Sequence, residues 1–239
     1  MTSTLPTLRA PVAPASPPSD YAVLKRRVQD AGLLDKQSGF YTRSIVVKMA
    51  LLAASLAGFV VLRGQPWALV LDAVVLAIIF GQLGFQLHDA GHRQMFEEGR
   101  ANVFVGLLTG NLLLGISYGW WVDKHNRHHA NPNDVDMDPD IGPGVISYSE
   151  EQALESRGLR RFIAKHQAAL FFPLLFGLAW AMHLNGVTFL RQRPSERRRL
   201  EIGLLALHVV LYVGFFAVVL GPWWALVVIV VHQCFAGFY

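Results

Sequence analysis

Five of the nine histidines in this 239-residue sequence fall in two short motifs between residues 88 and 129. His88 and His92 are four residues apart, and His125, His128 and His129 form an HxxHH motif. Residues three or four apart lie on the same face of a helix, so each motif can direct two imidazoles at one ion. Because His128 and His129 are adjacent, their imidazoles point in different directions and can reach a second ion. We expect all five histidines to be metal ligands.

The residue types around the two motifs exclude several kinds of metal site. Neither motif has the glutamate of the HExxH zinc proteases. The single cysteine, Cys234, excludes an iron–sulfur cluster or thiolate zinc site held by cysteines of this sequence. Nitrogen-rich sites suit iron, copper, nickel or zinc. Two irons fit the number of histidines best, although the spacing alone does not choose the metal.

Several carboxylates lie beside the histidine motifs. We expect Asp89 and Asp123 to accept hydrogen bonds from ligand imidazoles, the alternative being helix caps or exposed charges. Four more aspartates alternate over residues 134–140. They do not form a calcium loop, because Pro139 occupies the position where such a loop needs glycine. They either hydrogen-bond ligand histidines, cap helices or form a solvated acidic loop.

The composition indicates a membrane protein. Hydrophobic residues make up 53% of the chain and charged residues 16%, with a mean hydropathy of +0.35. An ordinary soluble domain carries about 25% charged residues. The formal net charge of +4 needs no nucleic acid as a partner, because cytoplasmic loops of membrane proteins are rich in Lys and Arg.

The hydrophobic pattern predicts an all-α, multi-pass membrane protein built from two transmembrane helical hairpins. Segments 45–62 and 67–87 are each close to the ~20 residues that cross a bilayer core, and so are 202–220 and 223–239. Turns at 63–66 and 221–222 divide the two pairs. Both short turns then lie on one side of the membrane, and the basic residues place the histidine motifs and the N-terminus on the cytoplasmic side.

Three other segments have less regular patterns. Segments 103–116 and 168–190 are apolar but interrupted by polar residues and glycines, so we expect them to lie in the interface or to be partly inserted. Residues 1–20 are rich in proline, serine and threonine and predict a disordered tail. Residues 21–239 then form one membrane domain.

The motifs and their flanks resemble those of the integral-membrane fatty acid desaturases, in particular the bacterial acyl-lipid/acyl-CoA branch. The resemblance rests on HDAGHR at 88–93, WVDKHNRHHANPN at 121–133, DMDPDI at 136–141 and HQ at 232–233. It implies a di-iron centre held by the five histidines. The family pattern has a third histidine box, which is expected after the fourth span. Because the sequence stops at Tyr239, we expect the domain to be incomplete at its C-terminus.

The resemblance also implies the reaction. The family introduces a C=C bond into a fatty acyl-CoA or acyl-lipid substrate, using O2 and electrons from a separate donor such as a ferredoxin, cytochrome or reductase. His208 and His232 lie within predicted spans, where interhelical hydrogen bonding is the usual role. We also retain His232 as a weaker candidate ligand.

Two alternative functions remain open. A related membrane hydroxylase or ketolase uses the same kind of cage to add oxygen to its substrate. A non-catalytic membrane protein, in which the histidines bind a metal for transport or structure, depends on neither O2 nor an electron donor. The charge-free segment 202–239 is unfavourable for transport.

Overall fold

The computed structural model describes residues 19–193 and 196–239, and its regular elements there are helices. The chain divides into two compact units, Met1–Lys36 and Gln37–Tyr239. The first contains α1 (Asp20–Asp30), whose N-terminus is capped by the Ser19 side chain. Residues 1–18 of the expected disordered tail lie outside the described residues. All further description concerns the second unit.

Three helices of this unit are long and apolar enough to cross a membrane, or up to five elements if each bent helix pair counts as a span. They are α2 (Ser38–Val61), α3 (Pro66–Gly91) and α9 (Arg198–Phe238). The predicted segments 45–62 and 67–87 correspond to α2 and α3. Pro66 begins α3 because its missing N–H and fixed φ suit the first helical position.

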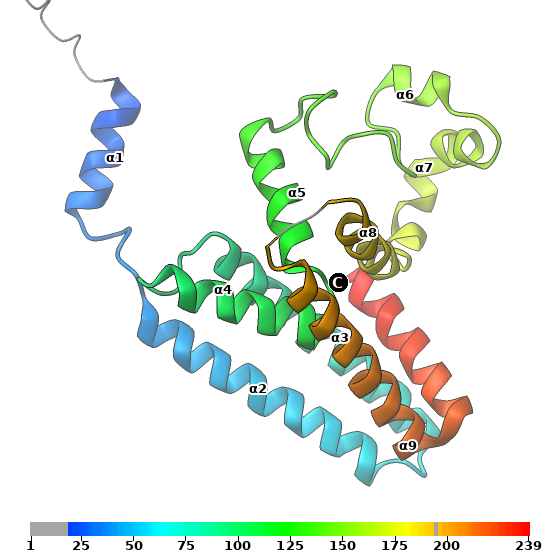
Figure 1. Ribbon diagram of the computed structural model, residues 1–239. Coiled ribbons are helices and arrows are strands. Elements are labelled where there is room, and N and C mark those ends of the chain that lie inside the picture. The colour runs from blue at the N-terminus through cyan, green and yellow to red at the C-terminus, as the bar shows by residue number, and fades with distance from the viewer. Residues whose placement is uncertain (1–18, 194–195) are drawn as a thin grey trace, which may run out of the picture. The chain divides into compact units, whose positions relative to one another are not determined.

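The predicted break at 221–222 divides α9 into two halves. A straight helix of 41 residues would be about 60 Å long, twice the thickness of a bilayer core. Gly221 instead has φ 75° and ψ 164°, a conformation open to glycine, and Pro222 follows it. The two halves therefore fold back on each other, as Figure 1 shows in orange and red.

The remaining helices are shorter and include two sharply bent pairs. The first is α4 (Gly99–Leu107) with the π-helix η1 (Leu108–Leu114), followed at 113° by α5 (Tyr118–Ala130). After α6 (Glu150–Glu155), α7 (Leu159–Leu175) and α8 (Leu178–Gln192) meet at 84°. Segment 168–190 is thus broken rather than one continuous helix. Pro173 lies inside α7 and Gly177 precedes α8, and both residues favour a helix end.

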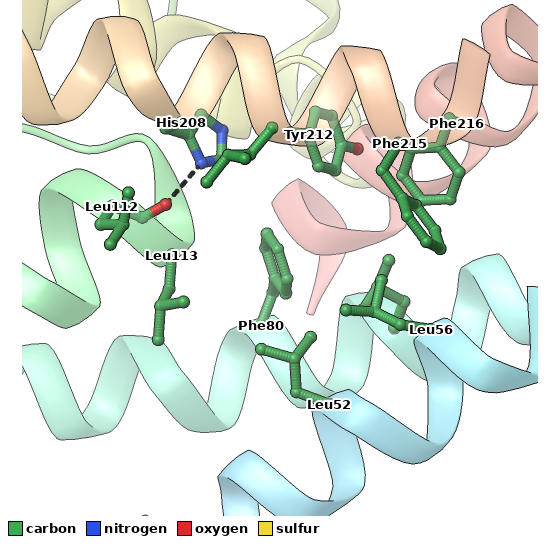
Figure 2. Close-up of a pocket in the computed structure, with 11 residues that line it drawn as sticks. Leu52, Leu56, Phe80, Leu112, Leu113, His208, Tyr212, Phe215 and Phe216 are labelled. Carbon is green, nitrogen blue, oxygen red and sulfur yellow. Dashed lines mark hydrogen bonds between the residues drawn. The ribbon is translucent and has the colours of Figure 1, made fainter. Parts of the chain in front are cut away.

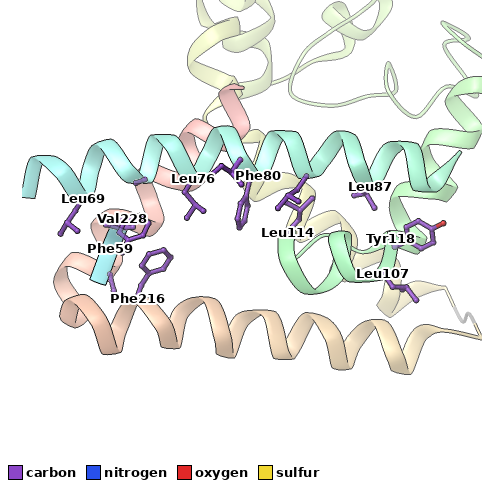
Figure 3. Close-up of a cluster of buried hydrophobic side chains, with 14 residues drawn as sticks. Phe59, Leu69, Leu76, Phe80, Leu87, Leu107, Leu114, Tyr118, Phe216 and Val228 are labelled. Atoms are coloured by element: carbon purple, nitrogen blue, oxygen red, sulfur yellow. The ribbon is translucent and has the colours of Figure 1, made fainter. Parts of the chain in front are cut away.

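The core lies where α2, α3, η1 and α9 meet (Figure 3). Phe59 and Phe216 are fully buried and pack edge to face, with ring centroids 4.9 Å apart. Apolar side chains also cover the outside of these helices: Trp67 beside the α2–α3 turn is 71% exposed, and Trp223 beside the α9 turn is 69% exposed. Aromatic residues in such positions are typical of a membrane–water interface.

Candidate metal centre

The C-terminal ends of α3 and α5 carry the two histidine motifs. His88 lies in the last turn of α3, and His92 is its C-cap, with a backbone N–H that donates to the His88 carbonyl over 3.1 Å. Ser117 caps the start of α5 by accepting from the Trp120 N–H. The three histidines of the second motif follow two to three turns later. The positive charge of Arg127 there also suits the negative end of the helix dipole.

Four of the five predicted ligands form one group, which we call the histidine cluster: His88, His92, His125 and His129. His125 is central, because its Nε2 lies 3.0 Å from Nε2 of His92 and 3.0 Å from Nε2 of His129. The His88 ring centroid is 4.9 Å from that of His125. Donor nitrogens of His88, His92 and His125 all lie within 4.8 Å of one another. Residues 33 positions apart in sequence therefore share one site.

The fifth predicted ligand, His128, is held by an aspartate. Its Nδ1 lies 2.9 Å from Oδ2 of Asp138, whose side chain is fully buried. Asp138 also accepts the backbone N–H of Asn133 over 2.8 Å and of Asp140 over 2.9 Å. This arrangement leaves Nε2 of His128 as the nitrogen available to a metal, and a carboxylate partner of this kind orients a ligand imidazole.

The two predicted carboxylate partners have different surroundings. Oδ1 of Asp89 lies 3.1 Å from Nδ1 of His88, as expected for a carboxylate that fixes the ring. Asp123 instead pairs with Arg127 over 3.1 Å and with Arg193 over 3.3 Å. Arg127 is one helical turn away on the same face of α5, so it gives the Asp123 carboxylate an ion-pair partner within the helix.

Trp121 forms a wall of the histidine cluster. Its indole stacks on the His125 ring at 4.4 Å and 24°, and it meets the His88 ring edge-on at 5.5 Å. Gly91, inside the first motif, makes this approach possible. A Cβ at that position would overlap the indole. The glycine of HDAGH therefore has a packing reason that the histidine spacing alone does not reveal.

The cluster keeps its central imidazoles neutral. Burial, followed by repulsion from His129 and the other neighbouring histidines, lowers the pKa of His125 from 6.5 to about 4. Burial and repulsion from His88 and His129 also lower the pKa of His92. Burial alone would raise the pKa of Asp138, but the Asn133 N–H and His128 offset it and hold that pKa below its usual value. Metal ligation requires neutral imidazoles. His92 and His125 meet this requirement, and the charged Asp138 supports the neighbouring ligand His128.

The donor set fits a nitrogen-preferring metal. Ring nitrogens 3.0 Å apart are held together either by a proton, in an N–H···N hydrogen bond, or by a shared cation. Two nitrogens each about 2.1 Å from one ion lie about 3.0 to 3.4 Å apart at bond angles of about 90° to 109°. The observed spacing therefore matches shared coordination, and imidazole donors suit iron, copper, nickel and zinc.

His232 is placed elsewhere, in the second half of α9. It is fully buried, with its ring 4.4 Å from that of Phe80 and its Nδ1 2.6 Å from the Tyr212 hydroxyl. Its Nε2 is buried without a hydrogen-bond partner among the described residues. His232 thus joins the packing of α3 against α9, and the described metal-ligand groups do not include it.

Two cavities adjoin these residues. One of about 400 Å³ lies directly beside the cluster, bounded by His88, His125, Trp121, Ile116 and Gly84 among others. A second, of about 310 Å³, lies between α2, α3, η1 and α9 and is almost entirely apolar (Figure 2). His208 borders this second cavity and donates from Nδ1 to the Leu112 carbonyl over 2.9 Å. The expected interhelical role of His208 is confirmed.

Comparison with known proteins identifies the family. The family profile described as "Fatty acid desaturase" matches residues 65–239. The chain is 32% identical over 211 residues to the acyl-lipid (9-3)-desaturase of Physcomitrium patens, covering 83% of this chain and 39% of that protein. It is 28% identical over 205 residues to a Delta(8)-fatty-acid desaturase of Helianthus annuus, covering 81% of this chain and 44% of that protein.

The chain spans less than half the length of these curated relatives. No solved structure matches it significantly. The family profile covers most of the chain, including both histidine motifs and the helices that position them. The chain therefore belongs to the membrane fatty acid desaturase family.

Proposed function

We propose that this chain contributes to an O2-dependent fatty acyl desaturase, in which His88, His92, His125, His128 and His129 hold iron. The observation that carries this proposal is the convergence of imidazoles from α3 and α5, with Nε2 atoms of His92 and His129 each 3.0 Å from that of His125. Five histidines in two groups favour two irons over one. The ring nitrogens of the histidine cluster and Nε2 of His128, whose ring is held by Asp138, offer two separate groups of donors.

The iron would supply an oxidant generated from O2 and external electrons, which is needed because no side chain removes hydrogen from an unactivated CH2 group. The reaction converts –CH2–CH2–, O2, two electrons and two protons into –CH=CH– and two waters. The protein's own part is orientation and shelter. Asp138 and Asp89 hold the His128 and His88 rings, and Trp121 covers His125.

The cavity beside the cluster is the proposed place of the reacting methylene groups. It brings the cluster next to apolar walls formed by Leu87, Ile116 and Met182. An acyl chain there would have its carbon atoms beside His88 and His125. Lys124, at the same cavity, pairs with Asp140. The substrate is an acyl-CoA or an acyl-lipid, and the electrons come from a separate ferredoxin, cytochrome or reductase.

We further propose four spans, formed by α2, α3 and the two halves of α9. Both turns, at 63–66 and at Gly221, then face the non-cytoplasmic side. The histidine cluster, at the opposite end of α3 from Pro66, and the N-terminus then face the cytoplasm, in agreement with the basic residues near that end. In this arrangement residues 21–239 form the membrane domain.

Product analysis tests the proposed reaction. Membranes containing the natural full-length protein are supplied with labelled acyl substrates, O2 and a reducing system, and the products are analysed by mass spectrometry. We expect a loss of two mass units, absent in a His125→Ala variant and in the absence of O2. A gain of 16 mass units would assign a hydroxylase instead. No O2-dependent product, together with retained metal, would favour a non-catalytic metal-binding protein.

A further inference from the structure

We propose that Glu201 is a positioning residue that fixes the start of α5 and thereby the second histidine motif; this inference rests on the proposed metal-binding function. Glu201 lies in the first turn of α9 and is only 2% exposed. Its Oε2 accepts three hydrogen bonds. The donors are the Ser117 hydroxyl at 2.7 Å, the Gly119 N–H at 3.1 Å and the Asn111 side-chain amide at 3.2 Å.

These contacts belong to a larger arrangement that satisfies the first turn of α5. The first N–H groups of a helix have no partner within the helix. Here the Tyr118 N–H donates to Oδ1 of Asn111 over 3.1 Å, the Gly119 N–H to Glu201, and the Trp120 N–H to the Ser117 hydroxyl over 3.1 Å. The negative charge of a carboxylate also suits the positive end of the helix dipole.

The surrounding backbone leaves little freedom for this turn. A Cβ on Gly119 would lie 2.6 Å from Oε1 of Glu201, and a Cβ on Gly186 of α8 would lie 3.2 Å from the Ser117 Cβ. Gly115, in the left-handed conformation with φ 71°, ends the π-helix that carries Asn111. Glu201 therefore joins η1, α5 and α9 at one buried point.

This anchor matters because it holds α5 at the turn where the helix is most deeply buried. Of its thirteen described residues, the buried ones are Tyr118 and Trp120, both in the first turn. His125 lies six residues beyond Gly119, which is about 9 Å along the helix. The direction and rotation of α5 at its buried first turn thus determine where His125 and His129 meet His92. Sequence spacing gave no sign of this, since Glu201 is 84 residues from Ser117.

Cobalt titration of the purified full-length protein in detergent tests the proposal. The absorption bands of bound Co²⁺ report its ligand geometry as well as its affinity. In Glu201→Leu we expect the Co²⁺ affinity to fall at least about tenfold, the lower range for partners behind metal ligands, with altered bands. Glu201→Gln should largely restore both, because the amide oxygen can accept the same three hydrogen bonds.

A matched control comes from the other end of α3. Asp72 accepts a hydrogen bond from Ser55 over 2.8 Å, a helix-to-helix carboxylate–serine pair like that of Glu201 and Ser117. It lies sixteen residues before His88, about 24 Å along α3. Asp72→Leu should leave the Co²⁺ affinity and bands unchanged. Ser117→Ala, which removes one donor and the α5 cap, should change the bands even where Glu201→Leu does not fold.

Unchanged affinity and bands in a folded Glu201→Leu protein, or in Ser117→Ala, would overturn the positioning role. An equal loss in Asp72→Leu would also overturn it, because the effect would then be general destabilisation. Failure of the wild-type protein to bind Co²⁺ at the histidines would instead contradict the proposed metal-binding function itself.

Discussion

The molecule contains two sets of histidines with opposite surroundings. In the cluster at the ends of α3 and α5, ring nitrogens face other ring nitrogens at 3.0 Å. On α8 and α9, each histidine has a protein partner: His183 donates to the Gly115 carbonyl over 2.8 Å, His208 to the Leu112 carbonyl over 2.9 Å, and His232 lies 2.6 Å from the Tyr212 hydroxyl.

This difference separates a binding role from a structural one. A buried polar group is normally satisfied within the protein, and the histidines of α8 and α9 largely follow that rule. His183 ties α8 to the end of η1, His208 ties η1 to α9, and His232 joins the two halves of α9.

In the cluster, the ring nitrogens of His92, His125 and His129 have mainly one another as partners. Such a group ties no helix to the core, and a shared cation would give it a role. The groups that face the ring nitrogens of a histidine thus indicate its role better than its position in an apolar helix does.

The largest expected effect is the loss of metal from His125→Ala. His125 is the one residue within 3.0 Å of two other cluster nitrogens, so its removal should lower iron affinity by more than about 100-fold, beyond the range for outer partners. Metal content of the purified protein measures this. His166→Ala is the matched control, because His166 lies on α7 and packs on Phe162. Equal iron content in the two variants would contradict the assignment of His125 to metal binding.

A smaller loss is expected from Asp138→Asn. The substitution keeps an acceptor for His128 but removes the buried charge behind it, so metal affinity should fall about 10- to 100-fold. Competition with a chelator measures the change. Asp136→Asn is the control from the same acidic loop, since Asp136 is exposed. If both variants behaved alike, the loop would act only through its total charge.

The opposite pattern is expected from His208→Leu. It leaves the Leu112 carbonyl without its donor, at a cost of about 1–3 kcal/mol for an unsatisfied buried group, while the cluster keeps its nitrogens. Thermal unfolding in detergent, followed together with metal content, separates the two effects. Loss of metal without loss of stability would place His208 with the cluster histidines.

The smallest effect is a pH dependence of the metal-free protein. The pKa of His125 is lowered from 6.5 to about 4 in the folded state, and that of His92 is lowered too. The unfolded chain therefore binds more protons in this interval, so stability falls as pH drops from about 6.5 towards 4. Melting curves across this range should show a weaker dependence in His125→Ala, with the share of His92 retained. An unchanged dependence would assign it to other groups.

Many features of the fold and of the candidate site could be predicted from local sequence patterns. Helical spacing indicated both histidine motifs, and glycine with proline marked the turns at 63–66 and 221–222. Contacts between helices were not accessible in the same way. Hydrogen bonds between the aspartates of 134–140 and ligand histidines were one expected alternative, but the choice of Asp138 as the partner of His128 and the hydrogen bonds of Glu201 follow no helical period. Asp123 shows the converse, because proximity in sequence suggested a histidine partner but arginines compete for it.

The most direct test of the central claim is an anomalous difference map at the iron absorption edge from crystals of the iron-loaded full-length protein. We expect iron within bonding distance of Nε2 of His92 and His125. We expect none beside His183, His208 or His232. Iron found among the α8 and α9 histidines, or a cluster free of metal in protein that contains stoichiometric iron, would contradict it.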